Sequence, residues 1–190
     1  MKTKIIIAFF VLASFSCQKE SVQKPFSLTT TSNESSLAVK PKIGDLYGGG
    51  MIAWIDPSGR HGIIVGLEDL APTVWSYNPY IDIQVYGGIV GDGKKNSLEI
   101  YRILQKVDNY AVLECKQYRG GGYKDWFLPS IIELGYAFTA GQYGATFNSD
   151  TAYWSSSAAS AREAIVSAYP GAQGSHFKEW IRLVRPIRYF

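Results

Sequence analysis

The feature that most constrains the fold is a short stretch in which an extended segment turns into a helix. Pro129 has no backbone N–H to donate, and it pushes Leu128 toward an extended conformation. Ser130 stands where a helix N-cap belongs, and Glu133 follows three residues later, as a capping box requires. The apolar residues that come next are spaced to bury one face of that helix: Ile131, Ile132 and Leu134. The sequence therefore predicts a strand-to-helix corner over residues 126–134.

The size and composition of the chain favour one domain built from short elements. Its 190 residues suit a single domain with a leader and a tail. A hydrophobic content of 46% and an aromatic content of 14% are enough for a substantial core. The 13 Tyr, 9 Phe and 5 Trp, together with 19 Gly, indicate many turns rather than a helical bundle.

The first residues of the chain have the pattern of an export signal. Lys2 and Lys4 precede an apolar run over residues 5–15, which is too short to cross a membrane as a stable helix. Small serines and Cys17 follow. This pattern resembles a bacterial lipoprotein signal, in which Cys17 is lipidated and becomes the new N-terminus. Ordinary signal-peptidase cleavage after Ser16 is the alternative.

We therefore expect three parts: a signal peptide over residues 1–16, a flexible tether over 17–40 and a folded domain over 41–190. The tether is rich in Ser, Thr, Lys, Gln and Asn without apolar periodicity, a composition that cannot bury enough surface to order itself. The protein is expected to be lipid-anchored at the outer membrane or cell surface of a bacterium. It should meet the membrane through this lipid only.

The charge balance argues against a nucleic-acid partner. The formal net charge is +3, and removal of the signal peptide takes away Lys2 and Lys4 without any acid, which leaves +1. Nucleic-acid-binding domains carry a strong basic excess, and this mature chain does not. The sequence does not indicate an oligomeric state.

The sequence offers little for catalysis or for a metal. If Cys17 is acylated, Cys115 is the remaining thiol, and its place in a helical pattern predicts a small buried residue. His61 and His176 are far apart, and neither the spacing of metal ligands nor a Gly-x-Ser-x-Gly elbow occurs. We expect no catalytic residue, no metal and no cofactor.

Before the corner, the pattern predicts a hairpin, a further strand, a long loop and two helices. Glycines 48–50 join short strands that end near residue 55, and an apolar strand follows over residues 61–67. Residues 68–93 read as a loop rich in aromatic residues. Asn96, with Glu99 three residues later, predicts the start of a helix that continues to Val107, and a second helix carries Cys115.

After the corner, Gly141 is expected to end the helix. Strands are predicted over residues 152–156, with alternate residues buried, and over 164–169, with residues 170–174 as a loop. Residues 180–188 alternate between apolar side chains and arginines, and Pro186 indicates an edge position or a strand end.

Several motifs, in this order, resemble the Lcl C-terminal domain family, within the C-type-lectin-like and formylglycine-generating-enzyme superfamily. The motifs cover nearly all of residues 43–190. They are Gly44-Asp45, Ile63-Ile64-Val65 before Trp75-Ser76, Gly91-x-Gly93-Lys94, Gly122-Tyr123-Lys124-Asp125-Trp126-Phe127-Leu128-Pro129-Ser130-x-x-Glu133-Leu134, Tyr153-Trp154-Ser155-Ser156 and Val184-Arg185-Pro186-Ile187-Arg188.

The resemblance implies an α+β, C-type-lectin-like fold: a twisted antiparallel sheet with two or three short helices and long loops that carry any binding surface. Relatives are mostly surface or secreted bacterial proteins, and the domain of the founding adhesin is linked to glycosaminoglycans and attachment. The oxidase of the superfamily needs a pair of copper-binding cysteines, which Cys115 alone does not provide. The triplets of calcium-dependent sugar-binding lectins are absent as well.

Binding is therefore expected through loops. The tryptophans of the predicted strands, Trp54, Trp126 and Trp154, should be buried in the core. The loops combine stiff aromatic residues with adaptable polar ones, as recognition surfaces do. Ten residues are candidates for ligand contact: Trp75, Tyr77, Asn148, Asp150, Arg162, Tyr169, Gln173, His176, Lys178 and Trp180. The alternative is that Trp180 folds inward and that the aromatics near residue 75 pack on themselves.

Three functions follow. The first is a non-catalytic, lipid-anchored recognition or adhesion module that binds an extracellular glycan or protein through C-terminal loops. The second is a structural subunit of a surface or pilus-like assembly. The third is an enzyme of the formylglycine-generating type, which the cysteine count disfavours.

Overall fold

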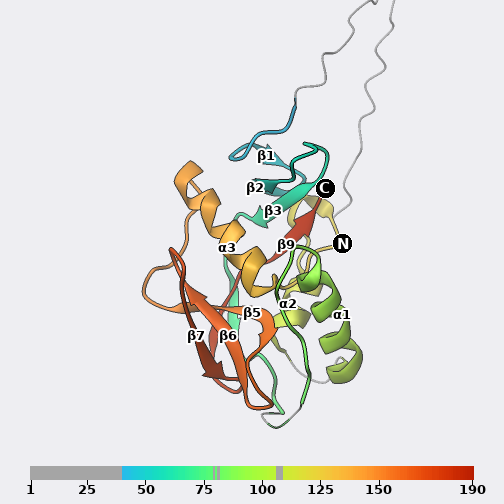
Figure 1. Cartoon of the computed structure of the whole chain (residues 1–190), viewed down its shortest axis with the longest axis vertical. Helices are drawn as coiled ribbons and strands as arrows, with labels where there is room; N and C mark the ends of the chain where they lie inside the picture. Colours follow the sequence, from blue (N-terminus) through green and yellow to red (C-terminus); the bar gives the residue numbers. More distant parts are fainter. Residues whose placement is uncertain (1–39, 79, 81, 106–108) are drawn as a thin grey trace, which may run out of the picture. The chain divides into compact units, whose positions relative to one another are not determined.

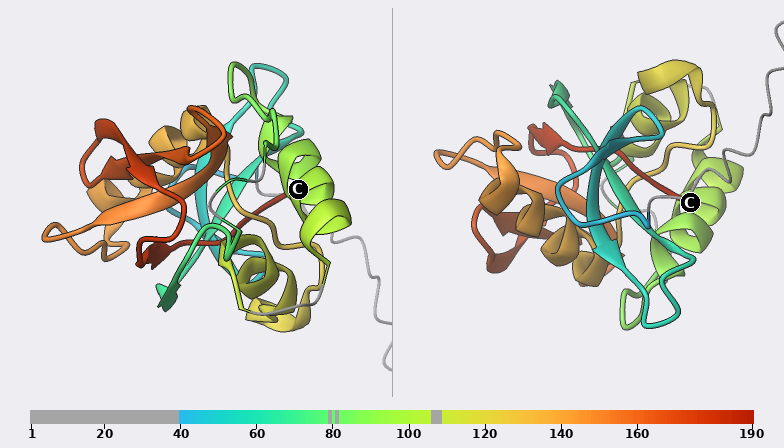
Figure 2. Two further views of the ribbon diagram at one scale, coloured as in Figure 1. Left: turned by 90° about the horizontal axis from the view of Figure 1, so that it is seen from below. Right: turned by 90° about the horizontal axis from the view of Figure 1, so that it is seen from above.

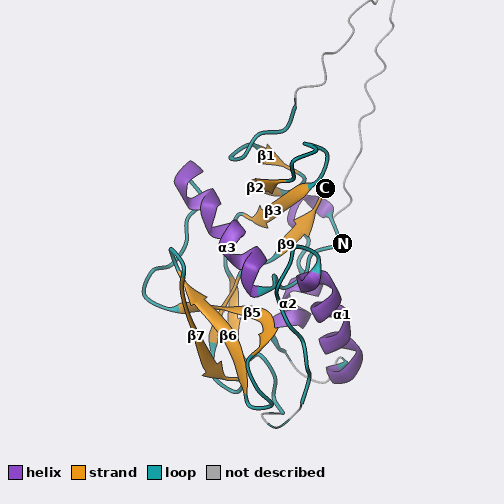
Figure 3. Cartoon of the chain, in the orientation of Figure 1, coloured by secondary structure: helices purple, strands orange, loops and turns teal. Residues whose placement is uncertain are grey.

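The computed structural model describes residues 40–78, 80, 82–105 and 109–190. From Lys40 onward the described residues form a compact unit of short strands and three α-helices (Figure 1). The expected signal peptide, Cys17, Val107 and nearly all of the expected tether lie outside the described residues. The predicted α+β class is confirmed, with helices and strands in the same unit (Figure 3), and both kinds of element contribute residues to the core.

The first sheet is antiparallel and contains the predicted glycine hairpin. Its strands, in spatial order, are β1 (Leu46–Tyr47), β2 (Gly50–Ile55), β3 (Gly62–Gly66) and β9 (Ile187–Tyr189). The turn between β1 and β2 holds Gly48 and Gly49 at φ of 57° and 86°, which L side chains rarely adopt. Gly49 also touches a neighbouring backbone, since a Cβ there would lie 2.4 Å from the Gly120 carbonyl oxygen.

The second sheet is mixed, so the expectation of one antiparallel sheet was incomplete. Its strands, in spatial order, are β4 (Leu70–Thr73), β8 (Arg182–Val184), β5 (Ala152–Ala158), β6 (Glu163–Ala168) and β7 (Ala172–Phe177). The pair β5–β8 is parallel, and the other pairs are antiparallel. The predicted strands over residues 152–156 and 164–169 are confirmed as β5 and β6, although β5 is buried on both faces.

Two strands lie where loops were expected. β4 falls inside the predicted loop over residues 68–93, and β7 begins inside the one over residues 170–174. The residues of β7 are mostly small and polar, and they have little strand propensity. Six consecutive pairs with β6, from Glu163↔Phe177 to Ala168↔Ala172, hold β7 in place instead. Tertiary pairing has overridden local preference here.

The helices are α1 (Asp92–Leu104), α2 (Ala111–Gln117) and α3 (Ile131–Thr139), with 3₁₀ turns at Gly120–Gly122 and Ala140–Tyr143. The prediction that Asn96 caps the first helix was wrong, because α1 begins four residues earlier. Asn96 is buried, and its side-chain amide donates hydrogen bonds to the Tyr86 carbonyl oxygen and, at 3.3 Å, to Ser156 Oγ. The second helix and the burial of Cys115 are confirmed.

The predicted corner is confirmed at its centre. Ser130 caps α3, and both hydrogen bonds of its capping box with Glu133 are present. Phe127 joins the corner to the first sheet through two backbone hydrogen bonds with Ile187, at 2.9 and 3.0 Å. Two details were wrong: Ile132 is 38% exposed, and the helix does not end at Gly141 but passes into a 3₁₀ turn that Gly144 closes at φ 101°.

Helix α3 contacts both sheets, which explains why its apolar residues do not share one face. Ala137, and Ala140 directly after the helix, pack on residues of the first sheet, where small side chains allow a close approach. Leu134 and Phe138 pack on Tyr153 and on Leu183 of the second sheet. The helix runs between β2–β3 and β5–β6 in Figure 1, and Figure 2 shows the same arrangement from two other sides.

The C-terminal segment is not one alternating strand. It is interrupted between β8 and β9 at Pro186, which stands at a strand end as predicted. Arg185 is buried rather than solvated, and its guanidinium lies 2.7 Å from Asp69 Oδ1, 2.9 Å from the Gly66 carbonyl oxygen and 2.6 Å from that of Thr146. A buried charge persists only with such partners.

The core contains two of the three tryptophans expected there. Trp126 and Trp154 are buried, whereas Trp54 is only partly covered and packs its ring against Tyr136 at 5.3 Å. Among the described residues, no helix has both the length and the apolar character needed to cross a membrane.

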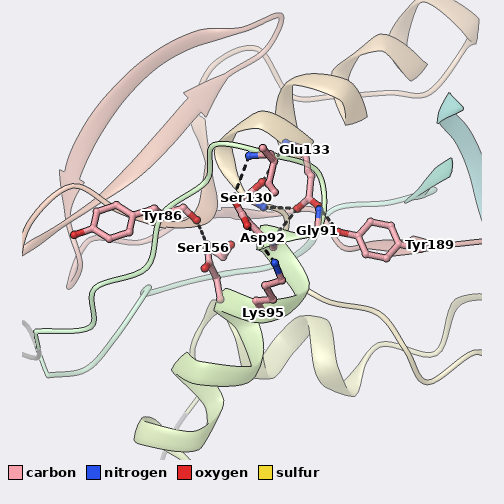
Figure 4. Close-up of polar contacts among 11 residues, drawn as sticks. Tyr86, Gly91, Asp92, Lys95, Ser130, Glu133, Ser156 and Tyr189 are labelled. Carbon is pink, nitrogen blue, oxygen red and sulfur yellow. Dashed lines mark hydrogen bonds and ion pairs between the residues drawn. The ribbon is translucent and has the colours of Figure 1, made fainter. Parts of the chain in front are cut away.

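A buried carboxylate ties α1, α3 and β9 together. Glu133 accepts hydrogen bonds from four donors: the backbone N–H groups of Gly91 at 2.7 Å, Gly93 at 3.0 Å and Ser130 at 2.9 Å, and the hydroxyl of Tyr189 (Figure 4). Burial, and then Glu133 itself, raises the pKa of Tyr189, so this hydroxyl keeps its proton. One side chain thus accepts hydrogen bonds from the unpaired N–H groups at the starts of two helices that lie about forty residues apart in the sequence.

We expect Glu133→Gln to destabilise the protein more than Ser130→Ala. The amide offers one acceptor oxygen, so buried N–H donors lose a partner at a cost of about 1–3 kcal/mol each. Loss of the Ser130 hydroxyl removes one cap, worth about 1 kcal/mol. Urea unfolding of both variants measures the difference. Equal losses of unfolding free energy would show that Glu133 acts only as the cap of α3.

Candidate functional site

The β6–β7 hairpin and the turn after it bring exposed and half-buried aromatic and basic side chains together. The turn is closed by the Trp180 N–H, which donates to the Phe177 carbonyl oxygen at 2.9 Å. We call this set the Trp180 surface, and it consists of six residues: Tyr80, Arg162, His176, Phe177, Trp180 and Arg182. Three of the predicted candidates, Arg162, His176 and Trp180, belong to it.

Trp180 is the most prominent member of the surface. Its side chain remains 43% exposed although three neighbours contact its ring. Phe177 packs edge-on at 5.3 Å between ring centroids, His176 lies at 5.1 Å, and the guanidinium of Arg182 lies 5.1 Å from the ring centroid. These contacts restrict the rotamer of the indole while leaving part of it open to a ligand. The alternative, in which Trp180 folds into the interior, does not hold.

Arg162 contacts two aromatic rings of the surface. Its guanidinium lies 4.9 Å from the Phe177 ring centroid and 5.1 Å from that of Tyr80, which is 69% exposed. An ion pair with Glu179 at 3.7 Å is exposed and therefore weak. The guanidinium keeps donors available for a ligand that approaches from solvent.

His176 connects this surface to the core. Its ring contacts Trp180 and also approaches the buried Trp154, whose ring centroid is 6.5 Å away. Arg182 Nε donates a hydrogen bond to His176 Nδ1 at 2.7 Å, which requires that nitrogen to be unprotonated. Burial first, and then the charge of Arg182, lowers the pKa of His176 below its usual range.

Two predicted candidates lie beneath the surface rather than on it. Trp75 is 1% exposed, and its indole N–H donates to the Ser155 carbonyl oxygen at 2.9 Å. Lys178 is buried against it, with Nζ 4.6 Å from the Trp75 ring centroid and 2.9 Å from the Ala161 carbonyl oxygen. The surrounding residues predicted both to lie on loops, but these contacts turn them inward. Trp75 and Lys178 therefore hold the turn against the core.

The other candidates lie elsewhere. Tyr169 is half-buried, stacked on Phe147 with ring centroids 5.2 Å apart. Asn148 and Asp150 are exposed, but Asn148 Oδ1 accepts the Asp150 N–H at 2.7 Å and so serves its own turn. Gln173 is exposed near the opposite end of β7, and Tyr77 is 55% exposed on the segment after Trp75. The structure does not join these residues to the Trp180 surface.

Sequence reasoning missed Phe177 and Arg182. Both flank Trp180 closely in sequence, and an aromatic or basic residue two or three positions from an exposed tryptophan is the signal that could have indicated them. Tyr80 lies five residues after Trp75, in the loop that was predicted to be rich in aromatic residues. Its link to Arg162 depends on the tertiary fold.

The described residues offer little for catalysis. Within them, no group of three or more His, Cys, Asp or Glu side chains could hold a metal ion. Burial raises the pKa of the Cys115 thiol well above its usual value, which disfavours the reactive thiolate. Glu133 is buried with four hydrogen-bond donors, so its oxygens are committed to the fold.

Acid should destabilise the wild-type protein more than a His176→Gln variant. The folded-state pKa of His176 lies below the unfolded value of about 6.5. As the pH falls, the unfolded chain therefore binds a proton at His176 more readily than the folded protein does. The stability that neutral His176 contributes above about pH 6.5 is lost as the pH falls through the folded-state pKa. Urea unfolding at pH 7.5 and pH 5 tests this. The same pH dependence in both proteins would contradict it.

Comparison with protein-family models and with curated proteins gives no match for this chain. The role of the Trp180 surface is therefore argued from its geometry and chemistry. In those terms it is a partly exposed aromatic surface with two arginines, carried by the β6–β7 hairpin and the turn after it.

Proposed function

We propose that this protein is a non-catalytic, lipid-anchored recognition module that binds an extracellular glycan or protein through the Trp180 surface. The observation that carries the proposal is the state of Trp180: a large ring that is partly exposed yet held by three neighbours. Binding energy at interfaces concentrates in aromatic and arginine side chains of this kind. Because the ring is already held, little side-chain entropy is lost when a ligand covers it.

The surroundings of the ring suit a polar ligand with flat faces. The planar guanidinium group of Arg162 contacts the ring of Phe177, and that of Arg182 contacts the ring of Trp180. Tyr80 adds a second exposed ring. Aromatic rings provide contact area, and guanidinium groups donate to hydroxyl, carboxylate or carbonyl oxygens. A sugar chain and an extended peptide both present such groups.

A C-type-lectin-like fold belongs to the same proposal. The α+β domain, with two sheets, three helices and a binding surface on the C-terminal hairpin and turn, is compatible with it. The resemblance of the 122–134 and 184–188 motifs to the Lcl C-terminal domain family supports it from the sequence side.

A structural subunit of a surface or pilus-like assembly is the second candidate, and β7 favours it. Within the described residues this strand ends its sheet, and its outer edge pairs with no other strand. Ala172–Phe177 contains no Lys, Arg, Asp, Glu or Pro, which many natural edge strands use to prevent pairing with another chain. Purification of the protein from membranes with a stoichiometric neighbour would favour this candidate.

Trp180→Ala should weaken ligand binding without unfolding the protein. Loss of a central aromatic contact typically costs about 2 kcal/mol or more, roughly thirtyfold in Kd. Tyr143→Ala is the control, since it removes a ring of similar exposure, 52%, from the 3₁₀ turn after α3. A glycan array followed by calorimetry on the best hit measures both. Equal binding by the two variants, or an array without any hit, would count against glycan recognition at Trp180.

Lipid anchoring is tested separately at Cys17. The signal pattern predicts that the wild-type protein incorporates a fatty-acid analogue and fractionates with membranes, whereas Cys17→Ala does neither. Metabolic labelling and fractionation of cells that express each form provide the measurement. Labelling of Cys17→Ala would show that the residue is not the attachment site, and an unlabelled wild type would support ordinary signal-peptidase cleavage.

A further inference from the structure

A second candidate site lies between α1, α2 and the residues that lead into the corner. The cavity there has a volume of about 170 Å³, and it shares no lining residue with the Trp180 surface. An apolar cavity of about 150 Å³ can hold one benzene molecule. The available space therefore suits a single six-membered ring with a small substituent.

The wall of this cavity is apolar. Its side chains come from two helices and the corner segment: Leu98, Tyr101, Val112, Trp126 and Phe127. The hydroxyl of Ser97 also lines it, but this group donates to the Leu128 carbonyl oxygen and accepts the Leu128 N–H, both at 3.1 Å. A ligand with many hydroxyl groups would lose hydrogen bonds to water here and would find no polar partner on the wall. The wall therefore favours an apolar ring.

The rim of the cavity is positively charged. Lys94, Lys116 and Lys124 border it, and Asp125 is the one acid among its lining residues. Asp125 is already paired, because Arg188 donates to both of its oxygens at 2.8 and 2.9 Å. The hydrogen bond from Arg188 is also the largest cause that lowers the pKa of Asp125. Three lysines thus line the cavity, and its one lining acid is already paired with Arg188.

Lys116 has a defined position on this rim. Its ammonium group lies 4.6 Å from the centroid of the Tyr101 ring, in a cation–π contact that holds it over the wall. An anionic group placed at the opening would find this charge already positioned. The apolar wall and the charged rim together describe a ligand with two chemically different ends.

We propose that this cavity binds a small carboxylate with one apolar six-membered ring. The ring lies against Tyr101 and Trp126, and the carboxylate meets Lys94, Lys116 and Lys124 at the opening. This site is independent of the proposed recognition surface, because the two share no residues.

Titration with benzoate tests the proposal, with benzyl alcohol and glucuronate as matched probes. Benzyl alcohol keeps the ring without the charge, and glucuronate keeps the charge on a hydroxylated ring. The indole N–H of Trp126, which donates to the Gly120 carbonyl oxygen at 3.2 Å, serves as the NMR reporter. We expect benzoate to shift this signal saturably and to bind more tightly than either other probe. No shift, or equal binding by benzyl alcohol or glucuronate, would overturn the proposal.

Lysine variants test where the carboxylate group of benzoate binds. Lys116→Gln and Lys94→Gln should each weaken benzoate binding about threefold. Lys95→Gln is the matched control, since it removes the same charge from the next position of α1 but does not line the cavity. It should leave the Kd unchanged, with circular dichroism confirming the fold of all three. A loss in Lys95→Gln equal to that in Lys94→Gln would refute the proposed contact.

Discussion

The fold depends on the buried carboxylate of Glu133. Its oxygens accept hydrogen bonds from backbone N–H groups at the start of α1, from the N–H of the α3 N-cap residue and from the hydroxyl of Tyr189 on β9. Helix starts carry unsatisfied donors, and in the interior these must be paired. By pairing two helix starts at one point, Glu133 sets where α1 lies relative to α3. It thereby sets the corner around which both sheets are arranged.

The position of the Trp180 surface follows from that arrangement. Helix α3 packs on both sheets, with small residues toward the first and with Leu134 and Phe138 toward the second. The second sheet carries the β6–β7 hairpin, whose turn is anchored by Lys178 and Trp75 below and exposes Trp180 above. A ring held in this way has few rotamers to lose on binding. Rigidity of the scaffold and exposure of the ring therefore belong together.

Two similar sequence patterns show how far local reasoning extends. Ser130 with Glu133 and Asn96 with Glu99 both place a capping residue three positions before an acid. The first forms the predicted capping box, because its partners lie within one helical turn. The second does not, because Glu133 fixes the start of α1 four residues earlier, from about forty positions away. Asn96 then binds Tyr86 and Ser156 instead. Long-range partners decide where local patterns compete.

The sequence by itself determined the α+β class, the strand-to-helix corner, the second helix and the burial of Cys115, Trp126 and Trp154, because these follow from local spacing and from large apolar side chains. Only the tertiary structure decided which charged residues turn inward and which aromatic ring stays outside. Arg185 and Lys178 are buried because groups from distant segments bind their charges. Arg185 donates to a carboxylate and a carbonyl oxygen, and Lys178 donates to a carbonyl oxygen and lies over an aromatic ring. Trp180 remains partly exposed because its neighbours cover one side of the ring and no other described segment covers the rest.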